Sequence, residues 1–302
     1  MSSREYSIYI NGKFYPKSEA KISVYDHGLL YGDGVFEGIR EYEGIVFQLP
    51  EHICRLYRSA NAVKLAIPIS MDAMTKAVIE TLKMNKLRNA YIRLIVTRGA
   101  GDMGVDPRNC ANPTIIVIAE QIEATYGKEA REKGIRVGFV STRRDVVDST
   151  THEVKSLNYM NSVLAKIDAN EAGWDDGVIL DHRGYVSETP TTNIFMVNGV
   201  DTIITPPASA GILNGITRIR VIKLGKDLGF NVVERDITPF ELMTADEVFL
   251  TGTKSEVVPV VSVSGRTIGD GKVGTITRRL IDEFMKIRKD PSEGTSVDTY
   301  KA

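Results

Sequence analysis

Residues 153–159 have the sequence EVKSLNY and are the first of three short runs that carry chemically distinctive residues. The other two are residues 186–195, VSETPTTNIF, and residues 211–218, GILNGITR. They contain a lysine, a glutamate beside a strand-like segment, and a glycine that precedes a helix-like segment. A cofactor with an aldehyde, a basic ring nitrogen and a phosphate needs these three kinds of group. Together the runs predict a pyridoxal phosphate site.

Lys155 is the expected attachment point for the aldehyde. A single lysine is more often a solvated surface residue. Two features of its surroundings favour the chemical role: small residues beside it leave room for a ring, and Tyr159 follows four positions later. The Tyr159 hydroxyl can hydrogen-bond a phenolate oxygen of the cofactor.

Glu188 and the glycine run are the expected anchors of the ring nitrogen and the phosphate. Glu188 ends an expected strand with apolar neighbours, and a buried carboxylate is costly unless it is paired. A protonated ring nitrogen would pair it; a turn or a surface lysine is the alternative. Gly215 permits close backbone approach, and the first N–H groups of the following helix and the Thr217 hydroxyl can bind a phosphate. The Arg55 guanidinium and the hydroxyl of Thr253 are further candidates.

Composition limits the class of protein. At 302 residues, with 42% hydrophobic and 25% charged residues and a formal charge of -1, the chain resembles an ordinary globular protein of two domains. We expect no nucleic-acid or membrane partner, because there is no basic excess and no long apolar run. The N-terminal residues lack the pattern of a signal peptide, so we expect a cytoplasmic protein. Cys54 and Cys110 stand alone and the four histidines are scattered, so we expect structural thiols and no metal site.

Hydrophobic periodicity and turn residues predict mixed strands and helices. We expect domains at 1–121 and 134–302, joined by a polar linker at 122–133, and a mobile tail at 290–302. The expected strands include 7–10 with 13–15, 35–42 with 45–49, 91–97 with 113–119, 177–180 with 185–187, and 247–250; the expected helices cover about 53–63, 74–82 after the cap Ser70, 160–172, 217–228 and 274–286.

Residues 99–104, GAGDMG, match the glycine pattern of dinucleotide-binding folds and follow an apolar strand. A true fingerprint opens a helix, whereas residues 105–112 are short and rich in turn residues and lead into another strand. We therefore interpret the run as a loop between two strands. A nucleotide-binding protein remains an alternative of a different class.

The chain resembles the fold-type IV pyridoxal phosphate enzymes, and most closely the branched-chain amino acid aminotransferases. The motifs that carry this resemblance are residues 31–40 (YGDGVFEGIR), 51–56, 90–93 (AYIR), 155–159, 215–218 and 245–249 (ADEVF). The resemblance implies an α/β fold of two mixed domains, the larger C-terminal one barrel-like, with the cofactor at the domain interface. It also implies a homodimer or a larger homo-oligomer.

The resemblance further implies a role for each matching residue. Lys155 would be the Schiff-base lysine and proton shuttle, Glu188 the partner of the ring nitrogen and Tyr159 the contact to the phenolic oxygen. Further cofactor contacts would come from Arg55, Leu213, Gly215, Ile216, Thr217 and Thr253. Substrate contacts would come from Tyr31, Phe36, Gly38, Arg40, Tyr91, Arg93, Val105, Thr253 and Lys254, with Tyr31 and Val105 reaching in from the neighbouring subunit.

The implied activity is transamination of leucine, isoleucine and valine with 2-oxoglutarate. An apolar pocket would accept the branched side chain, and Arg40 or Arg93 would engage the acidic chain of glutamate. Two departures from the family pattern, Lys254 and the run Thr189-Pro190-Thr191-Thr192, lie beside expected contacts. Alternatives within the fold are a D-amino acid or (R)-amine transaminase and an aminodeoxychorismate lyase-like enzyme; a non-catalytic carrier of the cofactor is a further alternative.

Overall fold

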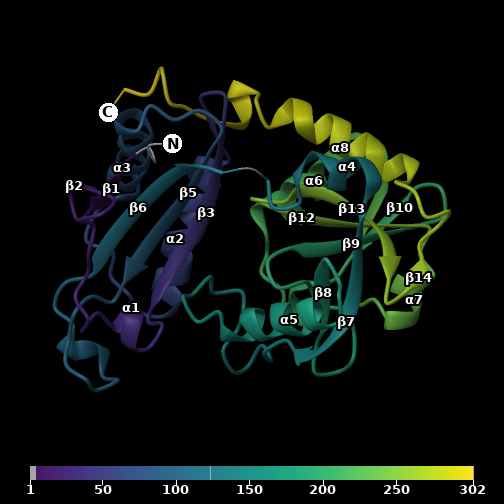
Figure 1. Ribbon diagram of the computed structural model, residues 1–302, viewed down its shortest axis with the longest axis horizontal. Helices are drawn as coiled ribbons and strands as arrows, with labels where there is room; N and C mark the ends of the chain where they lie inside the picture. The colour runs from purple at the N-terminus through teal and green to yellow at the C-terminus, as the bar shows by residue number, and fades with distance from the viewer. Residues whose placement is uncertain (1–4, 123, 302) are drawn as a thin grey trace. The chain divides into compact units, whose positions relative to one another are not determined.

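The computed structural model describes residues 5–122 and 124–301, which divide into two compact units (Figure 1). The first comprises Met1–Ile122, Val154–Asn158 and Arg288–Ala302, and the second Glu123–Glu153 and Tyr159–Ile287. Part of the stretch expected as a linker forms helix α4, Gly127–Lys133. The domain boundaries at 121 and 134 stay a prediction.

The first unit is built on a seven-stranded antiparallel sheet with the order β15-β4-β3-β5-β6-β1-β2. The expected hairpins are confirmed, and their turn residues Asn11, Gly12, Glu43 and Gly44 all have positive φ. The elements are β1 Ser7–Ile10, β2 Lys13–Pro16, α1 His27–Leu30, β3 Gly34–Tyr42, β4 Ile45–Phe47, α2 Leu49–Ala62, α3 Met71–Met84, β5 Ala90–Thr97, η1 Pro107–Asn109, β6 Thr114–Gln121, η3 Pro291–Glu293 and β15 Gly294–Ser296.

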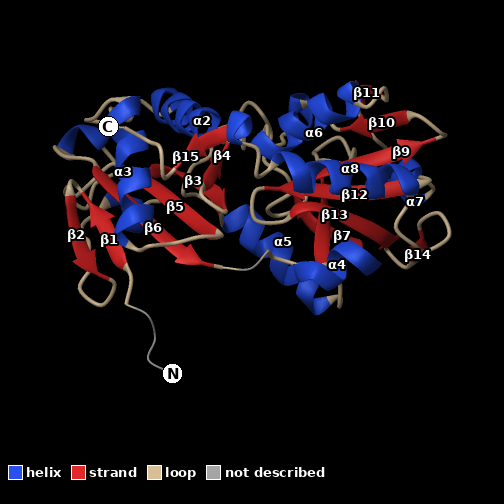
Figure 2. Ribbon diagram, turned by 90° about the horizontal axis from the view of Figure 1, so that it is seen from above, coloured by secondary structure: helices blue, strands red, loops and turns tan. Residues whose placement is uncertain are grey.

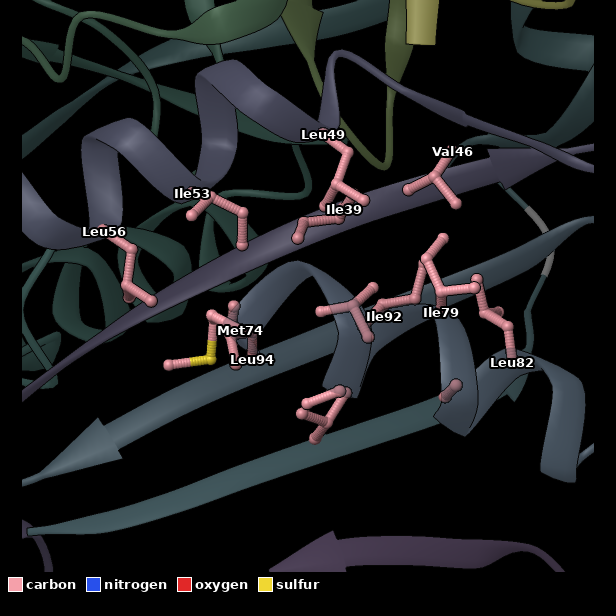
Figure 3. Close-up of a cluster of buried hydrophobic side chains, with 14 of the residues drawn as sticks. Ile39, Val46, Leu49, Ile53, Leu56, Met74, Ile79, Leu82, Ile92 and Leu94 are labelled. Atoms are coloured by element: carbon pink, nitrogen blue, oxygen red, sulfur yellow. The ribbon is translucent and has the colours of Figure 1, made fainter. Parts of the chain in front are cut away.

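One face of this sheet carries the core of the unit. Side chains alternate across a strand, so every second residue of β3 and β5 points toward α2 and α3. Ile39 of β3 and Ile92 of β5 pack there with Leu56 of α2 and Met74 of α3, as Figure 3 shows. The expected cap of α3 is confirmed, since the Ser70 hydroxyl accepts from the Ala73 N–H at 3.2 Å. The side chains of the intervening residues of β3 and β5 project from the opposite face of the sheet.

The expectation of a mobile C-terminal tail is wrong for residues 290–301. β15 pairs with β4 in antiparallel register, and the Val297 N–H donates to the Gly44 carbonyl at 2.8 Å. The Val297 side chain is 2% exposed, and Tyr300 packs against the core of the first unit. Because the tail is mostly polar in sequence, its two core-packing residues, Val297 and Tyr300, did not suggest an ordered segment.

Val297→Ala should lower the free energy of unfolding by about 2 kcal/mol, because two buried methyl groups are removed. Chemical denaturation would measure the change. The control is Val200→Ala, since Val200 is 90% exposed and its loss should change stability by less than about 0.5 kcal/mol. Equal effects of the two substitutions would contradict the ordered tail.

The second unit is built on an eight-stranded mixed sheet that forms a half-barrel. Its strand order is β11-β10-β9-β12-β13-β7-β8, with β14 paired to β13. Two mixed α/β parts, one of them barrel-like, confirm the expected fold class (Figure 2). The remaining elements are β7 Ile135–Arg143, α5 Met160–Glu171, β8 Asp176–Leu180, β9 Asn193–Asn198, β10 Thr202–Thr205, η2 Ala208–Ala210, α6 Ile216–Asp227, β11 Asn231–Glu234, α7 Pro239–Met243, β12 Glu247–Gly252, β13 Glu256–Val263, β14 Arg266–Thr267 and α8 Thr275–Ile287.

One expected strand of the second unit, residues 185–187, is reduced to a single bridge, between Leu180 and Val186. The segment still pairs with the end of β8, because the Asp181 N–H donates to the Tyr185 carbonyl at 2.8 Å and the Ser187 N–H donates to the Ile179 carbonyl at 2.9 Å. The Val186 N–H donates to the Ile237 carbonyl at 2.8 Å. The expected helices α5, α6 and α8 are confirmed within two residues at their ends. No helix within residues 5–122 and 124–301 has the length and apolarity needed to cross a bilayer.

Candidate active site

Five of the expected substrate residues of the first unit share the sheet face that is turned away from α2 and α3. Gly38 lies opposite Arg93, and Arg40 lies opposite Tyr91, so all four project to the same side as Phe36. A Cβ on Gly38 would collide with the Tyr91 hydroxyl, which explains why this position is glycine. The five residues therefore form one surface made of two aromatic rings and two cations, with the Tyr91 hydroxyl packed over Gly38.

The two arginines of this surface differ in how firmly they are held. The Arg40 side chain is buried, donates to the Ile122 carbonyl at 3.2 Å and lies over the Tyr42 ring. The Arg93 guanidinium is less buried and stacks on aromatic rings, 4.5 Å from the Phe36 centroid and 5.7 Å from that of Tyr91. Arg93 is thus the cation better placed to meet an incoming anion.

Lys155 reaches the edge of the same surface. Residues 154–158 lie against the start of β3, where the Phe36 N–H donates to the Lys155 carbonyl at 3.0 Å and the Lys155 N–H donates to the Ser59 hydroxyl at 3.3 Å. These bonds fix the lysine backbone, and its Nζ lies 4.5 Å from the Phe36 ring centroid. A lysine amine is thereby held beside the proposed substrate face.

Arg55 belongs to a buried cluster between α2 and β3. Its Nε and NH2 donate to the two carboxylate oxygens of Glu37 at 2.8 Å each, and His52 Nδ1 lies 2.7 Å from Glu37. Burial raises the pKa of Glu37, but the charges and hydrogen bonds of Arg55 and His52 outweigh it and lower this pKa to about 2. Burial lowers the pKa of His52. Glu37 therefore orients Arg55 through a bidentate pair, which the sequence did not reveal.

Glu37→Gln should cost about 3 kcal/mol of unfolding free energy at pH 7, because Arg55 loses its buried counter-charge. The lowered pKa makes the Glu37 contribution complete above pH 4.5 and progressively lost as pH falls toward about 2. The cost of the substitution should shrink over that window. Denaturant titrations of the wild-type and Glu37→Gln proteins at pH 7, 4.5 and 3 would measure it. A cost independent of pH would contradict the pairing.

Tyr31 and Val105, which were expected to serve a neighbouring subunit, lie in exposed loops of the first unit. The Tyr31 side chain is 40% exposed and its hydroxyl donates to the Met103 carbonyl, while Val105 is 79% exposed. The glycine run 99–104 lies between β5 and the short 3-10 helix η1 and opens no α-helix, which confirms its interpretation as a loop between two strands. Apolar side chains exposed in this way are available to another molecule.

Glu188 is the centre of a buried hydrogen-bond network in the second unit. Its side chain is 5% exposed, and its carboxylate accepts from Asn193 Nδ2 at 3.0 Å and from the Leu213 N–H at 3.2 Å. Asn193 also donates to the Leu213 carbonyl at 2.8 Å. The expected strand-end glutamate and the GILNG run are thus brought together, about 25 positions apart in the chain.

Arg144 is a partner of Glu188 that sequence reasoning missed. Its NH2 lies 3.2 Å from Glu188 Oε1, and its side chain is fully buried at the end of β7. Two adjacent arginines at residues 143–144 were a weak signal, because strand-end arginines are normally solvated. Only the fold shows that one of them compensates the buried carboxylate.

Residues 189–192, which follow Glu188, form a tight turn that is held together by hydrogen bonds of its threonine residues. The Thr189 N–H donates to the Thr192 carbonyl at 2.9 Å, and the Thr189 and Thr192 hydroxyls lie 2.6 Å apart. Glu188 and Asn193, which flank the turn, form an isolated bridge. Threonine side chains therefore supply the rigidity that presents Glu188.

The amino end of α6 is open to an anion. Gly215 is its N-cap and contributes no side-chain cap, and the first turn contains no acidic residue. A Cβ on Gly215 would collide with Asn193 Oδ1, so glycine is needed here for close packing. The buried Ile216 and Thr217 supply N–H groups and a hydroxyl at the positive end of the helix dipole.

The other expected residues of the second unit lie at the start of helix α5 and just after the end of strand β12. Tyr159 is the N-cap of α5 and its ring lies 6.2 Å from that of His152. Thr253 and Lys254 follow β12 directly and are half-buried, and the Lys254 carbonyl accepts from the Thr125 N–H at 3.3 Å. The roles expected for all these residues toward a cofactor or a substrate stay predictions.

Known proteins similar to this chain share its architecture along nearly its full length. A family model described as amino-transferase class IV matches residues 34–263. A putative branched-chain-amino-acid aminotransferase of Methanocaldococcus jannaschii is 54% identical over 93% of this chain and 96% of its own length.

The solved structures that resemble this chain include further branched-chain amino acid aminotransferases. A branched-chain amino acid aminotransferase from T.th., solved with pyridoxamine 5'-phosphate, superposes with a TM-score of 0.93 at 37% identity, covering 97% of this chain and 99% of its own. The Escherichia coli enzyme gives 0.91 at 36% identity, covering 93% and 94%. The chain therefore belongs to the class IV aminotransferases and, within them, to the branched-chain amino acid aminotransferase family.

Proposed function

We propose that this enzyme is a pyridoxal phosphate-dependent transaminase that converts leucine, isoleucine and valine to their 2-oxo acids, with 2-oxoglutarate as amino acceptor. The observation that supports it most is the shared sheet face of Phe36, Gly38, Arg40, Tyr91 and Arg93 with Lys155 at its edge. Membership of an aminotransferase family argues against a non-catalytic carrier. The loop conformation of residues 99–104 argues against the nucleotide-binding alternative.

The residues of the second unit fit the ring and phosphate of this cofactor. Glu188 is a buried carboxylate of the kind that pairs with a protonated ring nitrogen. The α6 terminus, with Gly215, Ile216 and Thr217, is uncapped and lacks acidic residues, as a phosphate dianion requires. Leu213 would support the ring, and Tyr159 and Thr253 would supply further polar contacts, to which Arg55 of the first unit would add its guanidinium.

The cofactor, when bound, supplies an aldehyde carbon and a ring that withdraws electrons from the substrate. The chain supplies the rest. Lys155 Nζ would take the α proton of the amino acid and deliver it to the C4′ carbon of the cofactor, a task that suits a tethered amine fixed at its backbone. Phe36 and Tyr91 contact a branched apolar side chain, and Arg93 or Arg40 binds the second carboxylate of glutamate. Thr253 and Lys254 would lie near the substrate carboxylate.

We also propose that the protein is a cytoplasmic homodimer, in which Tyr31 and Val105 of one subunit contribute to the site of the other. The exposure of Val105 and Met103 supports an apolar contact in this loop. Light scattering should give at least twice the chain mass of 33.3 kDa, and Val105→Asp should shift the distribution toward monomer. A monomer that retains full turnover would contradict this part of the proposal.

The substrate class is tested by half-reactions with a panel of amino donors. L-Leucine, L-isoleucine and L-valine should bleach the visible absorbance of the bound cofactor far faster than D-alanine or an (R)-amine. Preference for a D-amino acid or an amine would replace the proposed substrate with one of the alternatives of the same fold. Release of pyruvate from aminodeoxychorismate would indicate a lyase.

A further inference from the structure

One buried arginine in the second unit links the residues proposed to contact two different atoms of the cofactor ring. The Arg144 NH2 lies 3.2 Å from Glu188 Oε1 and donates to the Thr189 carbonyl at 3.0 Å. Its NH1 donates to Asn161 Oδ1 at 2.8 Å and to His152 Nε2 at 2.9 Å. One side of the guanidinium thus holds Glu188 and its turn, and the other side holds the first turn of α5.

The α5 side of this network leads to Tyr159. Asn161 lies two residues after Tyr159, the N-cap of α5, and its Nδ2 donates to the Arg143 carbonyl at 2.7 Å. Because a guanidinium has no acceptor, His152 Nε2 must accept the hydrogen bond from Arg144, and this orients the His152 ring, whose centroid lies 6.2 Å from that of Tyr159. Two contacts of Arg144 thus reach residues that adjoin Tyr159, one in sequence and one in space.

The surroundings of Arg144 are shaped to keep it in place. Gly211, which opens the GILNG run, has φ +76, and a Cβ there would lie 3.1 Å from Arg144 Cγ. The Arg144 N–H donates to the Leu180 carbonyl at 3.0 Å. A planar fork of five donors can satisfy several separated acceptors at once, whereas a lysine ammonium cannot. The site therefore requires the planar shape of the arginine side chain as well as its positive charge.

We propose that Arg144 is a positioning residue that holds Glu188 and Tyr159 at a set spacing, so that the ring nitrogen and the phenolic oxygen of the bound cofactor are engaged together. This inference rests on the proposed function, because it concerns how the cofactor ring is recognised. It assigns Arg144 no contact with the cofactor itself.

The test compares equilibrium binding of three ligands to the full chain after removal of its cofactor. The ligands are pyridoxamine phosphate, its 1-deaza analogue, in which carbon replaces the ring nitrogen, and its 3-deoxy analogue, which lacks the phenolic oxygen. Wild-type protein should bind pyridoxamine phosphate at least about tenfold more tightly than either analogue, since each analogue lacks one charge-assisted hydrogen bond. Titration calorimetry gives the two ratios without any measurement of turnover.

In Arg144→Met, both ratios should fall to about twofold or less, because Glu188 and Tyr159 are no longer aligned with the ring. Arg144→Lys retains a cation near Glu188 but not the fork, so the nitrogen ratio should persist and the phenol ratio should fall. The lysine variant also carries the test if the methionine variant does not fold. The matched control is Arg143→Met, since within residues 5–122 and 124–301 the exposed Arg143 side chain donates only to the Val140 and Ser141 carbonyls. Its ratios should equal those of wild type.

A purely structural role would weaken all three ligands equally and leave both ratios unchanged, which would overturn the inference. Loss of the nitrogen ratio alone in Arg144→Met would also overturn it, because Tyr159 would then be positioned independently. If wild-type protein binds none of the three ligands, the proposed function itself fails. The two failures are therefore distinguishable.

Discussion

Lys155→Ala should lower the turnover number with L-leucine by at least about 10³-fold, because the enzyme loses the amine that transfers the α proton. The Lys155 backbone is held by hydrogen bonds to Phe36 and Ser59, which alanine retains, so the fold should persist. The measurement is steady-state transamination with 2-oxoglutarate, together with a thermal melt.

Lys76→Ala is the matched control for this prediction. Lys76 lies in the same unit on the exposed side of α3, and within the described part of the chain its ammonium forms a single long ion pair, with Glu80 at 3.8 Å. Its removal should leave turnover within about twofold of wild type. Addition of methylamine should partly restore activity to Lys155→Ala and leave the control unchanged. Full turnover of Lys155→Ala would refute the assignment of the proton carrier.

Glu188→Gln should lower turnover by about 10²-fold or more, because the ring nitrogen would lose the carboxylate that keeps it protonated and the ring would withdraw electrons less strongly. The same substitution leaves Arg144 buried without its counter-charge, which should cost about 3–5 kcal/mol of stability. The two effects are separated by rapid-mixing half-reactions at a temperature where the variant is fully folded.

Glu171→Gln provides the comparison for Glu188→Gln. Glu171 is exposed at the end of α5 in the same unit, so its substitution removes a charge of the same sign without a buried partner. Stability and turnover should both stay near wild type. A Glu188→Gln protein with normal half-reaction rates would show that the buried carboxylate serves the fold and not the ring.

Features whose cause is local were predictable from the sequence. The Asn11-Gly12 hairpin and the Ser70 cap depend on a few adjacent residues, and both occur as expected. The alternation of Phe36, Gly38 and Arg40 along β3 likewise follows from the period of a strand. These three residues were recognised through family motifs, and the backbone geometry places them on one face.

Features that depend on distant parts of the chain were not predictable in the same way. Arg144 pairs with Glu188, and Arg55 pairs with Glu37, only because separate elements of the fold meet. In the sequence, these charged residues look no different from solvated surface residues. The C-terminal tail was misjudged for a related reason, since Val297 is a single apolar residue whose burial requires a partner strand far away in the chain. Buried charge pairs are thus the part of this enzyme that required three-dimensional information.

Borohydride reduction of the purified protein, followed by peptide mass mapping, is the decisive test of cofactor attachment at Lys155. We expect a phosphopyridoxyl group to become attached to the Lys155 side chain and to no other lysine. Its appearance on another residue, or its absence from a protein prepared with saturating pyridoxal phosphate, would contradict the proposed function.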